Sequence, residues 1–205
     1  MEKVSIPMYI GIFTNDNKSV HTDIYDTCEY VLDMINSRYK DDSVLTDISN
    51  ISKKETKVWS VISDPHITTL FLGKKIPKEI DQKKIFDSFI CDTKCDVCVY
   101  GVVYVTGGLI VGVTCEDRSV HMIDNRFDHI TLMVSSLTAK YSNNVLEYIL
   151  DNNKVLKAAR DNKFIDISHK DIYDMDITIK KAKYKAYFVK LEQPIVWKCS
   201  TKKIY

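Results

Sequence analysis

Two short segments of the sequence, residues 64–70 and 127–133, repeat one pattern in which His-Ile-Thr follows closely after an aspartate. Polar and apolar residues alternate around each motif, which is typical of a β-strand with one face in the core. Side chains two positions apart in a strand point to the same face, so the histidine and the threonine of each motif project together. The repeat therefore predicts two equivalent strands, each presenting an imidazole and a hydroxyl.

The rest of the sequence predicts helices interleaved with further strands. Strands are expected over 8–13, 57–62, 95–105, 109–114, 184–191 and 195–199, with a hairpin turn at Gly107-Gly108. Apolar residues at helical spacing predict helices over 22–39, over 77–90 and from about residue 142, whereas residues 40–54 are expected to form a loop. This order favours an α+β fold in which helices pack on antiparallel sheets.

The composition narrows the class of protein. A chain of 205 residues, 45% of them hydrophobic, can bury a sizeable core. The 29 basic and 28 acidic residues nearly balance, so no positive field is available for wrapping duplex nucleic acid, although a small anionic ligand remains compatible. The sequence lacks a long apolar run and a secretory signal, and its six cysteines lack the spacing of a small disulfide-rich domain. We therefore expect a cytoplasmic protein that does not span a membrane.

The two repeated motifs supply the candidate catalytic residues, His66, Thr68, His129 and Thr131. Imidazole titrates near neutral pH, so one ring can accept a proton from the nucleophile while the other donates a proton to the leaving oxygen. The threonine hydroxyls would donate hydrogen bonds to the non-bridging phosphate oxygens, where negative charge accumulates during the reaction. Four such side chains meeting in one groove would suffice to cleave a phosphodiester without a metal or another cofactor.

With these motifs the chain resembles the 2H phosphoesterase superfamily, whose members carry paired His-x-Thr or His-x-Ser motifs. The likeness is to the cyclic phosphodiesterase domain of fungal tRNA ligases in particular, and it includes residues 95–99 and 139–146 besides the histidine motifs. It covers about residues 8–150. The resemblance implies one two-lobed domain over 1–205, with antiparallel sheets and flanking helices around a central groove, in which residues 151–205 complete the sheets or form an accessory segment.

The resemblance also implies an activity. No kinase-type phosphate-binding loop and no nucleotidyltransferase lysine motif occurs, so a free-standing enzyme is expected. Free-standing viral members of the superfamily destroy host signals, namely 2′,5′-oligoadenylate or cyclic GMP–AMP with a 2′,5′ linkage. This chain uses lysine far more often than arginine, which is typical of AT-rich genomes and suggests a viral one. The implied protein is an immune-evasion nuclease of the host cytoplasm, acting on a small nucleotide or short oligonucleotide. A 2′,3′-cyclic phosphodiesterase acting on RNA ends and a non-catalytic nucleotide-binding module remain the alternatives.

Base binding would require aromatic platforms, and Phe71, Tyr104 and Tyr141 are the aromatic residues nearest the motifs. The remaining histidines, His21, His121 and His169, have no partner motif and are expected at the surface. The basic run 180–185 is expected to be a solvated strand edge.

The cysteines offer a competing hypothesis, because Cys91, Cys95 and Cys98 have a C-x₃-C-x₂-C spacing that holds an iron–sulfur cluster in some enzymes. Against it, Cys98 lies inside an apolar strand segment, which favours buried thiols. A zinc site built from these cysteines with His121 or His129 would lack the two close ligand pairs that structural zinc sites usually have.

Overall fold

The computed structural model describes residues 7–53, 58–73, 75, 78–115, 127–152 and 172–205. The helices are α1 (Asn17–Tyr39), α2 (Asp42–Ser52), α3 (Ile80–Ser88) and α4 (Ser142–Asn152), preceded by a 3₁₀ turn, η1 (Ala139–Tyr141). The strands are β1 (Tyr9–Thr14), β2 (Ser60–Val61), β3 (His66–Phe71), β4 (Lys94–Val105), β5 (Leu109–Cys115), β6 (His129–Val134), β7 (Ile172–Ile179) and β8 (Ala182–Ile204).

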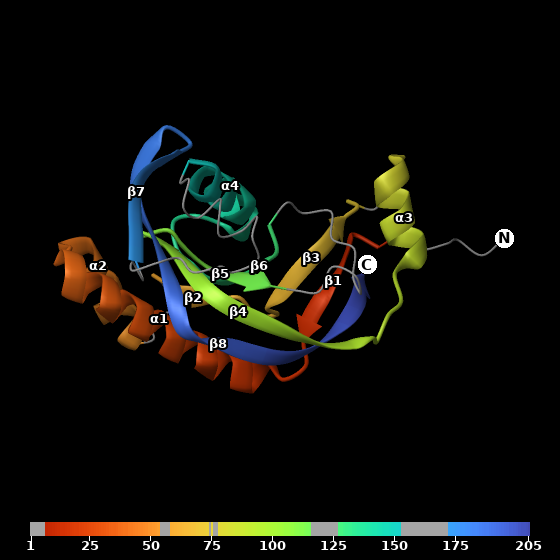
Figure 1. Ribbon diagram of the computed structural model, residues 1–205, viewed down its shortest axis with the longest axis horizontal. Coiled ribbons are helices and arrows are strands. Elements are labelled where there is room, and N and C mark those ends of the chain that lie inside the picture. The colour runs from red at the N-terminus through yellow and green to blue at the C-terminus, as the bar shows by residue number, and fades with distance from the viewer. Residues whose placement is uncertain (1–6, 54–57, 74, 76–77, 116–126, 153–171) are drawn as a thin grey trace.

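The described part of the chain is an α+β fold, as the sequence predicts, with an eight-stranded sheet in which every strand pairing is antiparallel. Figure 1 shows α1 and α2 on one side of the sheet and α4 on the other. The strands follow the order β2-β6-β5-β4-β8-β1-β3, with β7 paired to β8. No helix in the described ranges is both long and apolar enough to cross a membrane.

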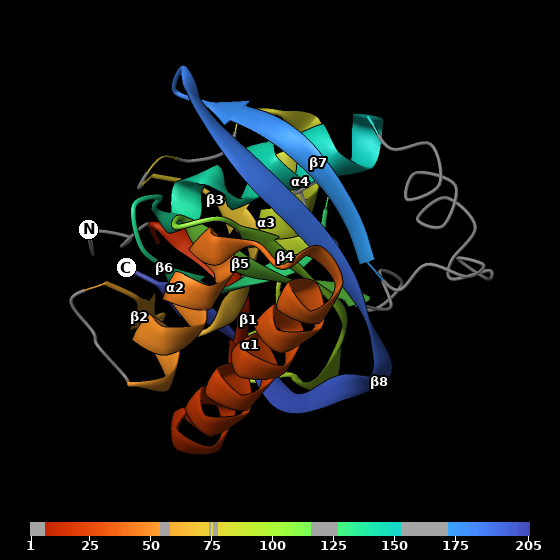
Figure 2. The ribbon, with the colours of Figure 1, turned by 90° about the vertical axis from the view of Figure 1, so that its left-hand side faces the viewer.

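The longest strand, β8, changes one of its neighbours along its length. One part of β8 pairs with β7 and the other part with β1, and β4 lies beside both parts (Figure 2). The pairing between β4 and β8 is interrupted at Tyr100. At this point β4 has one unpaired residue, and β8 has four, residues 191–194. Pro194 falls in this interruption, where the absence of a proline N–H costs no ladder hydrogen bond.

A short connection brings the two ends of the sheet together. β2 and β3 lie at opposite ends of the strand order, yet only residues 62–65 join them. A link of this length spans at most about 18 Å, because an extended chain advances roughly 3.3–3.6 Å per residue. The Ile62 N–H donates to the Leu132 carbonyl of β6 at 3.1 Å, and β3 and β6 approach with Cα atoms within 8 Å. The sheet therefore curls so that both His-x-Thr strands lie close together.

The two faces of the sheet have separate cores. Ile12, Ile67 and Ile130 pack with the apolar side of α1, including Ile24 and Val31. On the other face, valines of β4 and β5 pack against the apolar side of α4. Since Ile67 and Ile130 separate the histidine from the threonine in each motif, both His-x-Thr pairs point away from α1.

The predicted loop over 40–54 is wrong, because these residues form α2. Asp41 caps this helix by accepting a hydrogen bond from the Ser43 N–H at 2.9 Å, and Val44 and Ile51 are buried at helical spacing. The many polar residues between these two positions obscured the pattern. The strand β7 was not predicted, and the two strands expected over 184–199 are parts of the single strand β8.

Candidate active site

Each His-x-Thr strand carries a β-bulge directly after its threonine. The register against the neighbouring strand shifts there, which leaves Thr69 as the extra residue in β3 and Leu132 as the extra residue in β6. Bulges redirect side chains and occur often beside active sites. The repeat that the sequence predicts is therefore also a repeat of backbone geometry.

The bulge in β3 places an aromatic side chain on the face of the histidine. Phe71 lies opposite Tyr9 in the register, and the Tyr9 ring stacks on the His66 ring with centroids 5.1 Å apart. Residues directly opposite in an antiparallel pair share a face. Phe71 is 67% exposed on that face, so its predicted role in base stacking stays a prediction that the geometry permits.

Both histidine rings make the same backbone hydrogen bond. The Nδ1–H of His66 donates to the Asp64 carbonyl at 2.7 Å, and the Nδ1–H of His129 donates to the Phe127 carbonyl at 2.8 Å. A carbonyl can only accept, so the proton of each neutral ring is assigned to Nδ1. Nε2 is then the nitrogen of each ring that can accept a proton from a substrate or return one.

The loop before His66 is anchored to α1. Asn17 donates from Nδ2 to the Asp64 carboxylate at 2.9 Å and to the Ser63 carbonyl at 3.2 Å. The Nε2–H of His21 donates to the carbonyls of Ile62, at 3.1 Å, and Ser63, at 3.2 Å. His21 was expected to be a surface residue without a partner, but it is half-buried and supports the His66 loop.

The surroundings of the two rings lower the pKa of both histidines. Burial is the main cause of the lowered pKa of His66, opposed by its bond to the Asp64 carbonyl and by the Asp64 carboxylate. Burial also lowers the pKa of His129, which is 9% exposed, and the charge of a protonated His66 lowers it further. The hydrogen bond to the Phe127 carbonyl and the charge of the Asp128 carboxylate act in the opposite direction and raise the pKa of His129. The repulsion between the two charged rings disfavours the state in which both histidines are protonated.

The threonine of the second motif is held by the start of α4. The hydroxyl oxygens of Thr131 and Ser142 lie 2.8 Å apart, and Ser142 is fully buried. Sequence reasoning placed Ser142 at a helix start and within the stretch that carries the family resemblance, but it did not predict this contact. Either hydroxyl can be the donor, and when Ser142 donates, the Thr131 O–H is left to donate to a ligand.

The prediction that Tyr104 binds a base is wrong. Tyr104 is fully buried, and its hydroxyl donates to Asp47 at 2.6 Å, so it belongs to the core. Tyr141 is half-buried in η1, where the ammonium groups of Lys140 and Lys180 lie 5.3 and 4.7 Å from its ring centroid. It directly precedes Ser142 and stays a candidate for substrate contact.

Strand geometry argues against a shared metal site for the cysteines. Cys95 and Cys98 are three positions apart in β4, so their side chains point to opposite faces of the sheet. Cys95 packs against the core on the α1 side. Within the described ranges no group of three His, Cys, Asp or Glu residues is arranged to hold a metal ion. His121 and His169 lie outside the described residues.

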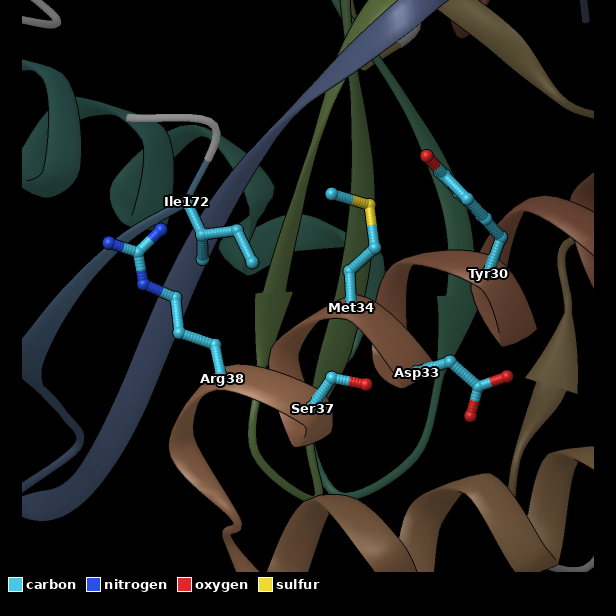
Figure 3. A pocket seen from close by; sticks show the side chains of 6 residues that line it. All are labelled: Tyr30, Asp33, Met34, Ser37, Arg38 and Ile172. Atoms are coloured by element: carbon cyan, nitrogen blue, oxygen red, sulfur yellow. The ribbon is translucent and has the colours of Figure 1, made fainter. Parts of the chain in front are cut away.

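Two surface cavities lie along α1, away from the histidines. The larger, about 480 Å³, lies between α1 and the start of β7 (Figure 3). Its lining residues are Tyr30, Asp33, Met34, Ser37, Arg38 and Ile172. The second, about 340 Å³, shares Tyr30 and extends to residues 191–195 of β8. Neither cavity includes a residue of the two His-x-Thr motifs.

No protein-family model and no curated protein sequence matches this chain. The case for a function therefore depends on the geometry of the two motifs. That geometry consists of two equivalent strands in contact, each with a histidine whose Nε2 can exchange a proton and with a threonine on the same face.

Proposed function

We propose that this protein is a metal-independent phosphodiesterase in which His66 and His129 act as the acid–base pair. The observation that carries the proposal is the repeated geometry of the two strands. Each strand has its bulge one residue after the threonine and a ring Nδ1–H bonded to the carbonyl two residues before the histidine. Strands equivalent in this way and close in space give a phosphodiester two imidazoles, of which one can act as the acid and the other as the base.

The difference in burial supports a division of roles between the two histidines. His66 is half-buried, whereas His129 is almost fully buried. Protonation of the more exposed His66 therefore requires less desolvation of charge than protonation of His129. His66 then acts as the general acid, and His129 acts as the general base. For a 2′,5′ linkage, His129 takes the proton of the neighbouring 3′-hydroxyl as that oxygen attacks phosphorus. The bond to the 5′ oxygen breaks, and this oxygen receives the proton from His66.

The threonines complete the proposed site. Thr68 and Thr131 donate hydrogen bonds to the two non-bridging oxygens, whose charge rises in the transition state. Strand pairing supports the two-lobed arrangement that the resemblance to the 2H phosphoesterases implies. On one side β3 and β1 extend from β8, and on the other side β6 and β5 extend from β4, and these two groups of strands would form the two lobes.

The proposed substrates are cyclic GMP–AMP with a 2′,5′ linkage and 2′,5′-oligoadenylate, in keeping with an immune-evasion nuclease of the host cytoplasm. The test is incubation of the protein in EDTA with each of these, with 3′,5′-linked RNA and with 2′,3′-cyclic mononucleotides. We expect the 2′,5′-linked compounds to be consumed and 3′,5′-linked RNA to persist. Consumption of the 2′,3′-cyclic mononucleotides alone would favour the RNA-end enzyme, and no consumption in EDTA would refute the proposal.

The pH profile gives an independent prediction. The acid must be protonated and the base neutral, so kcat/KM should be bell-shaped. Because the pKa of each histidine is lowered from its ordinary 6.5, protonation of the acid is already lost as the pH rises toward neutrality. The maximum is therefore expected on the acid side of pH 6.5. A rate that rises steadily into the alkaline range, and only with added divalent ions, would contradict the two-histidine assignment.

A further inference from the structure

A row of three residues crosses β3, β1 and β8 on the face of the histidines. Thr68 lies opposite Gly11, and Gly11 lies opposite Lys202. Residues directly opposite in antiparallel strands share a face, so Thr68 and Lys202 point the same way. Gly11 separates them without a side chain, and a Cβ at this position would lie 2.5 Å from the Ile67 carbonyl oxygen. The surface between the hydroxyl and the ammonium group thus carries no side chain from β1.

The Lys202 ammonium lies on the same side of the sheet as His66, with the Phe13 ring as a common neighbour. Its Nζ is 5.6 Å from the centroid of the Phe13 ring, and the Phe13 ring stacks on His66 with centroids 4.7 Å apart. These two distances place Nζ within about 10 Å of the His66 ring centroid. The side chain is exposed. Its charge can therefore act on a ligand that occupies the site.

The charge of Lys202 is not neutralised by the described residues. Lys198 lies on the same face of β8, but its Nζ forms an ion pair with the Asp96 carboxylate at 2.6 Å. In the part of the chain that the structure describes, no carboxylate forms an ion pair with Lys202. An exposed, unpaired ammonium group beside a phosphate site favours an anionic ligand.

The position of Lys202 indicates which anion it meets. The scissile phosphate would lie between β3 and β6. The backbone of Lys202 belongs to β8, which lies on the other side of β3, two strand positions away. At the usual strand spacing, the backbones of β3 and β8 are therefore roughly 10 Å apart. We propose that Lys202 binds a second phosphate of the substrate, so that the site prefers nucleotides with a phosphate beyond the one that is cleaved. This inference rests on the proposed function and narrows it, because a 2′,3′-cyclic mononucleotide has one phosphate only.

The test compares a 2′,5′-linked diadenylate with and without a terminal 5′-phosphate, since the two compounds share the same scissile bond. We expect the wild type to prefer the phosphorylated dimer by about tenfold in kcat/KM. Lys202→Met should abolish this preference, because it lowers kcat/KM for the phosphorylated dimer about tenfold more than for the unphosphorylated dimer, and Lys202→Arg should retain the preference. Lys203→Met is the matched control, because this neighbouring lysine points to the opposite face, with its Nζ 5.2 Å from the Phe86 ring centroid.

The remaining outcomes separate this inference from the proposed function. The role of Lys202 would be overturned if the wild type has the same kcat/KM for both dimers, or if Lys202→Met lowers kcat/KM equally for both. The proposed phosphodiesterase activity would still stand in either case. If neither dimer is cleaved, the proposed activity fails for this linkage, and equilibrium binding of the same two compounds tests Lys202 instead. The inference would be supported if the wild type binds the phosphorylated dimer more tightly and Lys202→Met removes this difference. Equal binding of the two dimers by the wild type would overturn it.

Discussion

Replacing either His66 or His129 with alanine should lower kcat on the cleaved nucleotide by roughly 10²–10⁴-fold while leaving its binding nearly unchanged. Each ring transfers a proton only during the reaction, so its loss raises the barrier more than it weakens the ground-state complex. Steady-state kinetics give kcat, and equilibrium binding of the same substrate to each variant gives the dissociation constant.

The double variant distinguishes a coupled pair from two independent residues. Because the acid and the base act in one step, removing both should cost little more than removing one. Asp33→Ala is a suitable control, because its exposed side chain lies on α1 and both His-x-Thr pairs point away from that helix. A nucleotide-binding module without activity would behave differently: alanine at His66 would then weaken binding, and there would be no turnover to lose.

Replacing Asp47 with alanine should lower the free energy of unfolding by about 3–5 kcal/mol, the largest stability effect we expect in this chain. Asp47 is 5% exposed and accepts three hydrogen bonds. Trp59 Nε1–H donates to Oδ1 at 2.9 Å, while the Tyr104 hydroxyl and the Gly107 N–H donate to Oδ2 at 2.6 and 2.8 Å. Alanine would leave the buried Trp59 and Tyr104 donors and the part-buried Gly107 N–H without this acceptor, and it would remove the hydrogen bonds that join α2 to the β4–β5 hairpin.

Urea denaturation measures the effect, with two comparison variants. Asp47→Asn retains one acceptor oxygen but turns an N–H₂ group toward the donors, so its loss should be smaller than that of alanine. Asp33→Ala, on the exposed side of α1, should change stability little. Equal losses from Asp47→Ala and Asp33→Ala would show that the three hydrogen bonds contribute nothing to stability.

The elements with clear periodicity were predictable from the sequence. The first helix, the β4–β5 hairpin and both His-x-Thr strands follow from hydrophobic spacing and glycine positions within a few residues. The pairing of the histidine with the threonine on each face follows from the two-residue period of a strand.

Other features depend on tertiary structure and could not be predicted from local patterns. The bulges at Thr69 and Leu132 leave no clear local signal, because they are visible only in the register against β1 and β5. Tyr104 lies in an apolar strand segment, where an aromatic residue can be in the core or at a site, and its full burial and its hydrogen bond to Asp47 are apparent only in the folded chain. Asp47 itself lies in a polar stretch where no partner is apparent until the hairpin folds over it.

The continuity of β4 and β8 bears on how the two imidazoles keep their separation. Each of these strands pairs with other strands on both sides of the interruption at Tyr100, so no flexible tether connects the two ends of the sheet through this region. A change in the distance between the His66 and His129 rings would require β4 and β8 to bend together. The place with the fewest ladder bonds between β4 and β8 to resist such bending is Tyr100 with residues 191–194, so any bend of the sheet would concentrate there.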